Sequence, residues 1–308
     1  MNILFGEKGG SSFSFSTSET FRAFLKEGVD RRAFIESFFS DRGVSTSNIS
    51  LSTGSHILVN YPKKNYNKKY KDKVFVAHYD RVDGSQGAND NSAATFMLMH
   101  FALYLSSLNY PHNIQIIFTD SEEAGREGIF KQGSYKLALG LRKLDMIDAD
   151  IYIFDMCGCG NTIIISRAGL YKREAKNMAT LLFLHNKAFS YAKELGSPYF
   201  SMLTAYSDNA GFIAGGLKAQ LITVLPYDEA LTLYLYLEEH KDDEKAQKLL
   251  DLILKNKKID ESSTFYHILP STWQKMNSDK DTLQSLTDSS FSLITRYMKL
   301  ISKKMERW

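Results

Sequence analysis

Short apolar runs of strand type alternate along this chain with helical segments of a dozen or more residues, and this alternation constrains the fold most strongly. Runs rich in Val, Ile and Phe predict buried strands, and apolar residues spaced three and four apart predict the helices between them. This order is typical of βαβ units, so we predict a mixed, mainly parallel sheet with helices on both faces, an α/β/α sandwich. The predicted strands are 73–77, 112–120, 148–156, 160–166 and 217–226, and the predicted helices are 30–43, 91–108, 172–195 and 288–308.

Two further segments extend this plan. Residues 49–61 alternate apolar and polar side chains around Thr53-Gly54, which predicts a β-hairpin. Residues 228–260 are helical and rich in charge, and no new strand follows them. We interpret them as an inserted helical pair, either a lid over a site or an association surface. No break in composition divides the chain, so we expect residues 1–308 to form a single domain.

Composition and charge exclude several classes of protein. The 308 residues are 44% hydrophobic, which suffices for a large core, and the net charge of +3 indicates no nucleic-acid partner. The basic run at 63–73 is short and predicts a solvated loop. No segment approaches the roughly 20 apolar residues of a membrane-spanning helix, and the N-terminus lacks a signal-peptide pattern. We therefore expect no membrane partner and, absent a removed leader, a cytoplasmic location.

The two cysteines are too few for a disulfide framework. Cys157 and Cys159 stand in a C-G-C spacing at a predicted strand end, which is no zinc signature. We interpret them as small buried thiols.

Three of the predicted strands end in side chains that bind metal ions, and a fourth such side chain precedes a helix. In open parallel sheets, ligands bind outside the carboxyl ends of the strands, so these side chains are expected to meet in one crevice. Clustered acids repel one another unless a cation lies among them. The residues are His78, Asp90, Asp120, Glu122, Glu123 and Asp155.

Each of these residues alone has an ordinary structural explanation, as a core histidine, a helix N-cap, a turn residue or a solvated acid. Together they favour a metal site. A neutral imidazole with carboxylate oxygens suits Zn²⁺, with Mn²⁺ or Co²⁺ as alternatives. The sequence therefore predicts one or two divalent ions.

The spacing also predicts roles within such a site. Asp80 lies two residues from His78 and points to the same side of an extended segment, so its carboxylate can orient the imidazole. Asp90 has two oxygens and could bridge two ions about 3.5–4 Å apart. Adjacent glutamates diverge, so Glu123 can ligate a metal while Glu122 acts as general base on a metal-activated water.

Ordered motifs across residues 73–216 resemble a known family. They are "AHYDRV", "GANDNSAA", "FTDSEEAGREGIFKQGS", "IFDMCG" and "YSDNAGFIAGG", with a weaker match, "WQKMNSDKDTLQSL", at 273–286. The chain resembles the di-zinc aminopeptidases of the bacterial leucyl aminopeptidase and aminopeptidase Y type, whose relatives include glutaminyl cyclases and glutamate carboxypeptidases. The resemblance does not cover the first seventy residues or the 228–260 insertion. It implies a zinc-exopeptidase fold and removal of N-terminal residues from peptides.

The same resemblance assigns roles to individual residues. His78 and Asp155 would hold one metal, Asp90 would bridge, and Glu123 would hold the second ion. Glu122 would be the base and Asp80 would orient His78. Asp208 lies where the family has an S-D-H segment near the substrate, but Asn209 replaces that His. Apart from the resemblance, Tyr206, Phe212 and the 228–260 insertion are candidates to line the substrate pocket.

The chain departs from the family at the last metal ligand, because "NSDKDTL" places Asn277 where the family has a His. An amide oxygen is a poor zinc ligand beside an imidazole nitrogen, so the second site is expected to be weak, empty or completed differently. His267, ten residues upstream, is a candidate replacement, although a structural His is the preferred interpretation.

Three functions stay open at this point. The leading hypothesis is a zinc-dependent aminopeptidase acting on peptide or small amide substrates. The first alternative is a catalytically impaired or non-catalytic member, motivated by Asn277 and Asn209. The second is acyl transfer with ring closure, as in glutaminyl cyclases.

Overall fold

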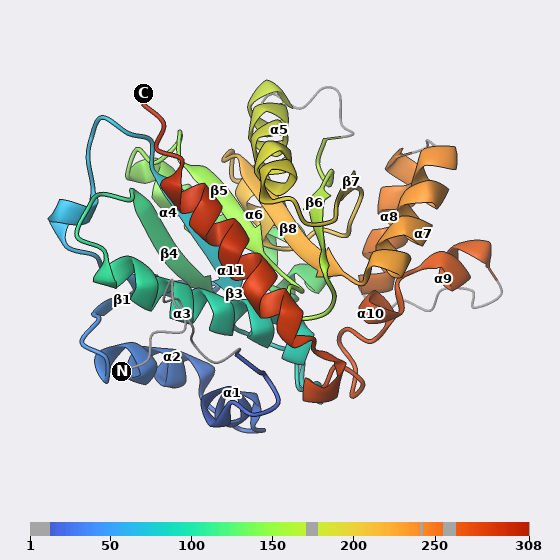
Figure 1. Ribbon diagram of the computed structural model, residues 1–308, viewed down its shortest axis with the longest axis horizontal. Coiled ribbons are helices and arrows are strands. Elements are labelled where there is room, and N and C mark those ends of the chain that lie inside the picture. Colours follow the sequence, from blue (N-terminus) through green and yellow to red (C-terminus); the bar gives the residue numbers. More distant parts are fainter. Residues whose placement is uncertain (1–12, 171–177, 241–242, 255–262, 308) are drawn as a thin grey trace.

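The computed structural model describes residues 13–170, 178–240, 243–254 and 263–307 (Figure 1). An eight-stranded sheet runs through it in the order β1-β2-β4-β3-β5-β8-β6-β7. The strands are β1 (Thr46–Leu51), β2 (Gly54–Val59), β3 (Lys73–His78), β4 (Ile114–Thr119), β5 (Asp150–Phe154), β6 (Thr162–Ser166), β7 (Tyr199–Met202) and β8 (Ala219–Leu225).

The sheet is mixed, with four parallel strands in its middle. β4, β3, β5 and β8 pair in parallel, whereas the β1–β2 hairpin joins β4 antiparallel and β6 joins β8 antiparallel. β7 pairs in parallel with β6 at the far edge. This confirms the predicted mixed, mainly parallel sheet and the hairpin around Gly54. β7 was not predicted, because its four residues include a Ser and give no long apolar run.

Helices cover both faces of the sheet, as predicted. α11 contacts α3 and α5 on one face, while α4 and α6 pack together on the other (Figure 1). These helices are α3 (Ala93–Ser107), α4 (Gly133–Lys143), α5 (Met178–Leu195), α6 (Asp208–Ala214) and α11 (Asp288–Lys303). The predicted helix at 172–195 is thus observed from Met178 onward, and its first residues lie outside the described part of the chain.

Two short helices precede the sheet. α1 (Glu19–Leu25) and α2 (Arg31–Ser40) each begin after an N-cap side chain. Ser18 Oγ accepts the N–H of Phe21 at 3.1 Å, and Asp30 Oδ1 accepts that of Ala33 at 2.9 Å.

The strand that leads into His78 is buried on both faces. Phe75 and Ala77 pack into the apolar cluster under α3 and α11, whereas Val74 and Val76 pack into the cluster under α4 and α6. Successive side chains of a strand point to opposite faces, so this alternation requires cover on both sides. At the start of the strand, the ammonium of Lys73 donates to the carbonyl of Ile301 at 2.8 Å and also to that of Lys304. The last helix is therefore tied to the strand that ends at the candidate site.

The predicted helical pair at 228–260 is present as α7 (Tyr227–Glu239) and α8 (Asp243–Leu254). Residues 241–242 and 255–260 lie outside the described part. With α9 (Thr264–Ile268) and α10 (Ser271–Gln274), these helices gather beside β6, β7 and β8 (Figure 1). A separate apolar cluster holds them there, and it includes Leu233, Leu250 and Trp273.

In the segments that the structure describes, none of the helices combines the length and apolar character needed to span a bilayer.

Candidate active site

Three neighbouring strands bring their ends to the same edge of the sheet. His78, the last residue of β3, is in register with Thr119, the last residue of β4. Asp155 follows β5 directly, and its N–H donates to the carbonyl of Ile222 on β8 at 3.1 Å. The convergence that the strand ends predict for His78 and Asp155 is therefore present in the structure.

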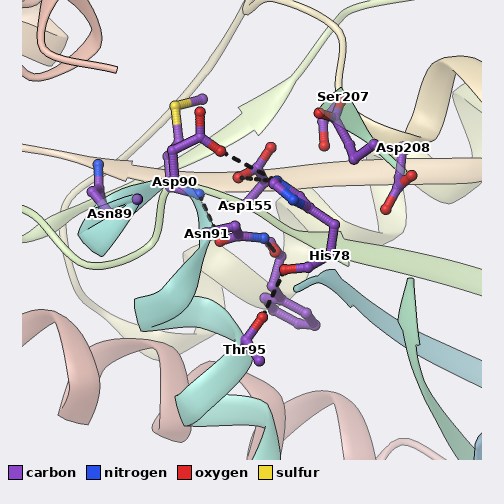
Figure 2. Close-up of polar contacts among 12 residues, drawn as sticks. His78, Asn89, Asp90, Asn91, Thr95, Asp155, Ser207 and Asp208 are labelled. Atoms are coloured by element: carbon purple, nitrogen blue, oxygen red, sulfur yellow. Dashed lines mark hydrogen bonds and ion pairs between the residues drawn. The ribbon is translucent and has the colours of Figure 1, made fainter. Parts of the chain in front are cut away.

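His78, Asp90 and Asp155 form a compact buried group (Figure 2). Nε2 of His78 lies 3.2 Å from Oδ1 of Asp90 and 3.5 Å from Oδ1 of Asp155. One potential ligand atom from each residue falls within 4.8 Å of the other two. One imidazole nitrogen and two carboxylate oxygens at this separation can surround a single ion.

The bonding of these atoms fits a divalent cation. Nε2 of His78 and Oδ1 of Asp155 are buried and make no hydrogen bond within the described residues. Burial alone would lower the pKa of His78, but Asp155 and the neighbouring carboxylates raise it well above its usual value. Burial also raises the pKa of Asp90. A buried imidazole nitrogen between two carboxylates is a donor set that zinc binds, so these residues fit that metal.

The loop that carries Asp90 is held by polar side chains from distant parts of the chain. The carboxylate of Asp281 accepts the N–H of Asn89 at 2.8 Å and that of Asp90 at 3.0 Å. The amide of Asn91 donates to the carbonyl of Phe154 at 2.9 Å (Figure 2). These bonds fix the backbone on both sides of Asp90, so its carboxylate has a defined position.

The opposite side of the His78 ring faces Asp80. Nδ1 of His78 lies 3.4 Å from Oδ1 of Asp80, whose carboxylate accepts the N–H groups of Glu122 at 3.1 Å and Glu123 at 3.0 Å. Burial would raise the pKa of Asp80, but His78 and these two N–H donors lower it overall. Asp80 therefore stays ionised and links the imidazole to the segment that holds both glutamates.

The two glutamates point to different partners, as predicted for adjacent residues. Oε1 of Glu122 accepts from Nε2 of Gln132 at 2.9 Å, whereas Oε2 of Glu123 pairs with Nη2 of Arg126 at 2.8 Å. Burial is the largest cause that raises the pKa of both carboxyls, well above the usual value for Glu122 and to about 9 for Glu123. Repulsion from Asp90 adds to the effect on Glu123.

The acids face a cavity of about 400 Å³. One part of its wall is apolar, and the insertion contributes Asp251 from α8. The lining residues are Asp90, Glu122, Glu123, Gly125, Arg126, Ile129, Gln132, Asp155, Met156, Gly169, Tyr206, Ala210, Ile213, Ala214, Asp251, Met276 and Asn277. The cavity therefore joins a carboxylate cluster to an apolar wall, an arrangement suited to an organic substrate with a polar group to be cleaved.

Of the two residues expected to line the substrate pocket, one lines the cavity and the other does not. Tyr206 lines the cavity, but the ring of Phe212 is fully buried in the cluster under α4 and α6. Its neighbour Ile213 lines the cavity instead. Asp208 lies on the other side of His78 from Asp90 (Figure 2), buried, with one carboxylate oxygen bonded to the hydroxyl of Thr119. Burial raises the pKa of Asp208 to about 6.

Asn209, which stands in place of the family His, closes the turn before α6. Its Oδ1 accepts the N–H of Ser207 at 2.8 Å, and the residue is buried. The side chain therefore has a local structural partner.

Asn277 lines the cavity, with a φ of 59° that lies in the left-handed region. Asn adopts this region more readily than most residues. His267 lies exposed on α9 and is not a lining residue of the cavity. Across the described ranges, His78, Asp90 and Asp155 are the one set of three His, Cys, Asp or Glu side chains close enough for an ion.

Some residues of the site were not singled out from the sequence. Three of them lie inside the quoted motifs: Arg126, Gln132 and Asp281. They could have been found as polar residues close in sequence to predicted ligands. Asp251 belongs to the insertion, and its place at the cavity depends on how α8 packs. No local pattern indicates that contact.

Comparisons with known proteins identify the family and the fold of the chain. Residues 56–293 match the model of peptidase family M28. Aminopeptidase YwaD of Bacillus subtilis (strain 168) is 42% identical over 67 residues, which are 21% of this chain and 15% of that protein. The matched segment is thus a small part of that relative.

Two solved structures have a similar fold. One is a Zn-dependent exopeptidase of Parabacteroides distasonis, with a TM-score of 0.59 and 14% identity, covering 96% of this chain and 100% of that one. The other is a glutaminyl cyclase of Porphyromonas gingivalis, with a TM-score of 0.57 and 16% identity, covering 92% and 95%. At these identities the likeness concerns the fold alone.

Proposed function

The chain belongs to peptidase family M28, and on that premise we propose that it is a metal-dependent exopeptidase that removes N-terminal residues from peptides. One observation carries the proposal. A buried group of His78, Asp90 and Asp155 adjoins Glu122 in a cavity with an apolar wall. A metal site beside a buried carboxylic acid is the arrangement that metal-assisted hydrolysis requires.

His78, Asp90 and Asp155 would hold a zinc ion. When bound, zinc supplies Lewis-acid chemistry that polarises the carbonyl group of a peptide bond. The buried atoms of His78 and Asp155 that lack hydrogen bonds support this assignment. The name of the Parabacteroides relative, a Zn-dependent exopeptidase, supports zinc over manganese or cobalt.

Glu122 would act as the general base. Gln132 occupies its Oε1, which leaves Oε2 to take a proton from the attacking water and pass it to the leaving nitrogen. The raised pKa of Glu122 suits a carboxyl that must accept and then release a proton.

Asp80 would orient the imidazole of His78. Its carboxylate lies 3.4 Å from Nδ1 and is itself fixed by two backbone N–H groups. A neutral His78 with its proton on Nδ1 presents a free lone pair on Nε2, toward Asp90 and Asp155.

The cavity would receive the end of a peptide that carries a free amino group. Ile129, Ile213 and Tyr206 line it and offer contact to an apolar side chain. Asp251 adds a carboxylate from α8, which attracts a protonated amine. We propose that the insertion acts as a lid over the substrate, and that Asp208 supports the floor of the site through Thr119.

The direct test is hydrolysis of aminoacyl anilides and dipeptides with added Zn²⁺, Co²⁺ or Mn²⁺. Glu122→Gln is the matched control, because it keeps the shape of the side chain and removes the base. We expect wild-type activity at least 100-fold above this control and little activity on N-acetylated substrates. Equal rates for both proteins with every metal would rule out the proposal.

A second candidate, ring closure of an N-terminal Gln, follows from the fold shared with the glutaminyl cyclase. Mass analysis of a Gln-initiated peptide separates the two reactions. Loss of ammonia would indicate cyclisation, and cleavage with addition of water would indicate hydrolysis.

A further inference from the structure

Glu123 already has a cation beside it. Nη2 of Arg126 lies 2.8 Å from its Oε2, and both side chains come from the short helix η3 (Glu123–Glu127), three residues apart. Both line the cavity, and the Glu123 side chain is 13% exposed. The Arg126 side chain is 25% exposed, so the pair is only partly screened by water and the guanidinium remains a local positive charge.

The second carboxylate oxygen of Glu123 has too few neighbouring ligands to hold an ion. Its Oε1 makes no hydrogen bond, which leaves it open to a cation. Yet within the described ranges no pair of His, Cys, Asp or Glu side chains joins Glu123 to make a three-ligand group. Asn277 from the end of the chain lines the same cavity, but its amide oxygen is neutral and weakly basic.

The charges of the residues that line the cavity also argue against a second ion. Five carboxylates line it, and Arg126 is the one Lys or Arg side chain among its described lining residues. One divalent ion at His78 would lie at the other end of this acid cluster. Without the guanidinium of Arg126, the negative charge beside Glu123 would have no positive charge to balance it. A second divalent ion at Glu123 would instead lie next to a fixed positive charge and be repelled.

We propose that the chain holds one metal ion, at His78, Asp90 and Asp155, and that the guanidinium of Arg126 replaces a second ion beside Glu123. This inference deepens the proposed function, since it assumes that the buried group binds a metal. Arg126 thereby positions Glu123 and balances its charge, and Asn277 is tolerated because no ion depends on it.

The test counts ions and does not depend on turnover. Wild type, Asn277→His, Arg126→Met and the double variant are dialysed against excess Zn²⁺, passed through a desalting column and analysed for zinc per chain by plasma mass spectrometry. We expect one ion in wild type and in each single variant, and two in the double variant. Lys131→Met removes a nearby exposed charge as the matched control, and His78→Ala should remove the ion from wild type.

Several results would overturn the inference: two ions in wild type, two ions in Asn277→His alone, or one ion in a folded double variant. Circular dichroism and thermal unfolding establish that each variant is folded. If the double variant does not fold, the wild-type and Asn277→His counts decide. Anilide hydrolysis tests the proposed function separately. Inactive protein with one ion would contradict the proposed function and leave the one-ion inference intact. Active protein with two ions would contradict only the one-ion inference.

Discussion

The side-chain amide of Gln132 donates to Oε1 of Glu122 at 2.9 Å, although the two residues are ten positions apart in the sequence. The Oε1 of the same Gln132 accepts the N–H of Gly211 in α6 at 3.0 Å. Gln132, which directly precedes α4, therefore connects the proposed base to α6, the helix that packs against α4. It fixes which oxygen of Glu122 faces the cavity.

Replacing Gln132 tests this positioning. We expect Gln132→Ala to lower kcat by about tenfold with little change in KM, because the carboxylate of Glu122 loses its fixed direction. The acid limb of the pH profile should also shift, since a donor to the ionised carboxylate is lost. Steady-state kinetics across pH check both effects. Gln274→Ala, which removes an amide that bonds to Tyr266 and Leu269 instead, should leave both unchanged.

Asp281 should control metal affinity without touching the metal. Its carboxylate holds the N–H groups of Asn89 and Asp90. We expect Asp281→Asn to weaken zinc binding by about 10–100-fold, because the Asp90 loop loses its support. Competition with a chromophoric chelator measures the affinity. The exposed Asp279 provides the control, and an equal loss in Asp279→Asn would contradict the assignment.

Asp251 should contribute to recognition of the substrate. Nε2 of Gln247 donates to its Oδ1 at 2.9 Å and to the carbonyl of Thr204 at 2.8 Å, which orients the carboxylate on α8. We expect Asp251→Asn to raise KM for free-amine substrates about tenfold, near 1.4 kcal/mol, with kcat nearly unchanged. Asp228→Asn on the exposed side of α7 is the matched control. A fall in kcat alone would assign Asp251 to the chemistry instead.

The stability of metal-free protein should depend on Asp208. Burial raises its pKa from 3.8 to about 6, so the folded state favours the protonated carboxyl. This contribution to the free energy of unfolding is complete below pH 4 and is lost as pH rises through 6, by at most about 3 kcal/mol. Thermal unfolding in chelator should show a decline between pH 4 and 7 that is smaller in Asp208→Asn. Identical declines in both proteins would show that other groups cause it.

The parallel centre of the sheet was predictable because each strand there is a short, mainly apolar run. The meeting of His78 and Asp155 followed from the same pattern, since parallel strands end at a common edge, whereas Asp90 reaches them on the loop before α3. β7 was missed because its pairing with β6, and not its composition, makes it a strand.

Other features depend on packing that no local pattern encodes. Phe212 and Ile213 are adjacent and both apolar, and the rotation of α6 alone decides that Ile213 faces the cavity. The pairing of Glu123 with Arg126 depends on the tight turn of η3 and on the shape of the cavity. Asp251 reaches the site only through the packing of the inserted helices.

The bonds from Lys73 to the carbonyls of Ile301 and Lys304 give the tail of the chain a hold on the strand that carries His78. A protein shortened before α11 would leave that ammonium without these acceptors at the root of the strand. Loss of α11 is therefore expected to destabilise β3, the strand that ends at His78.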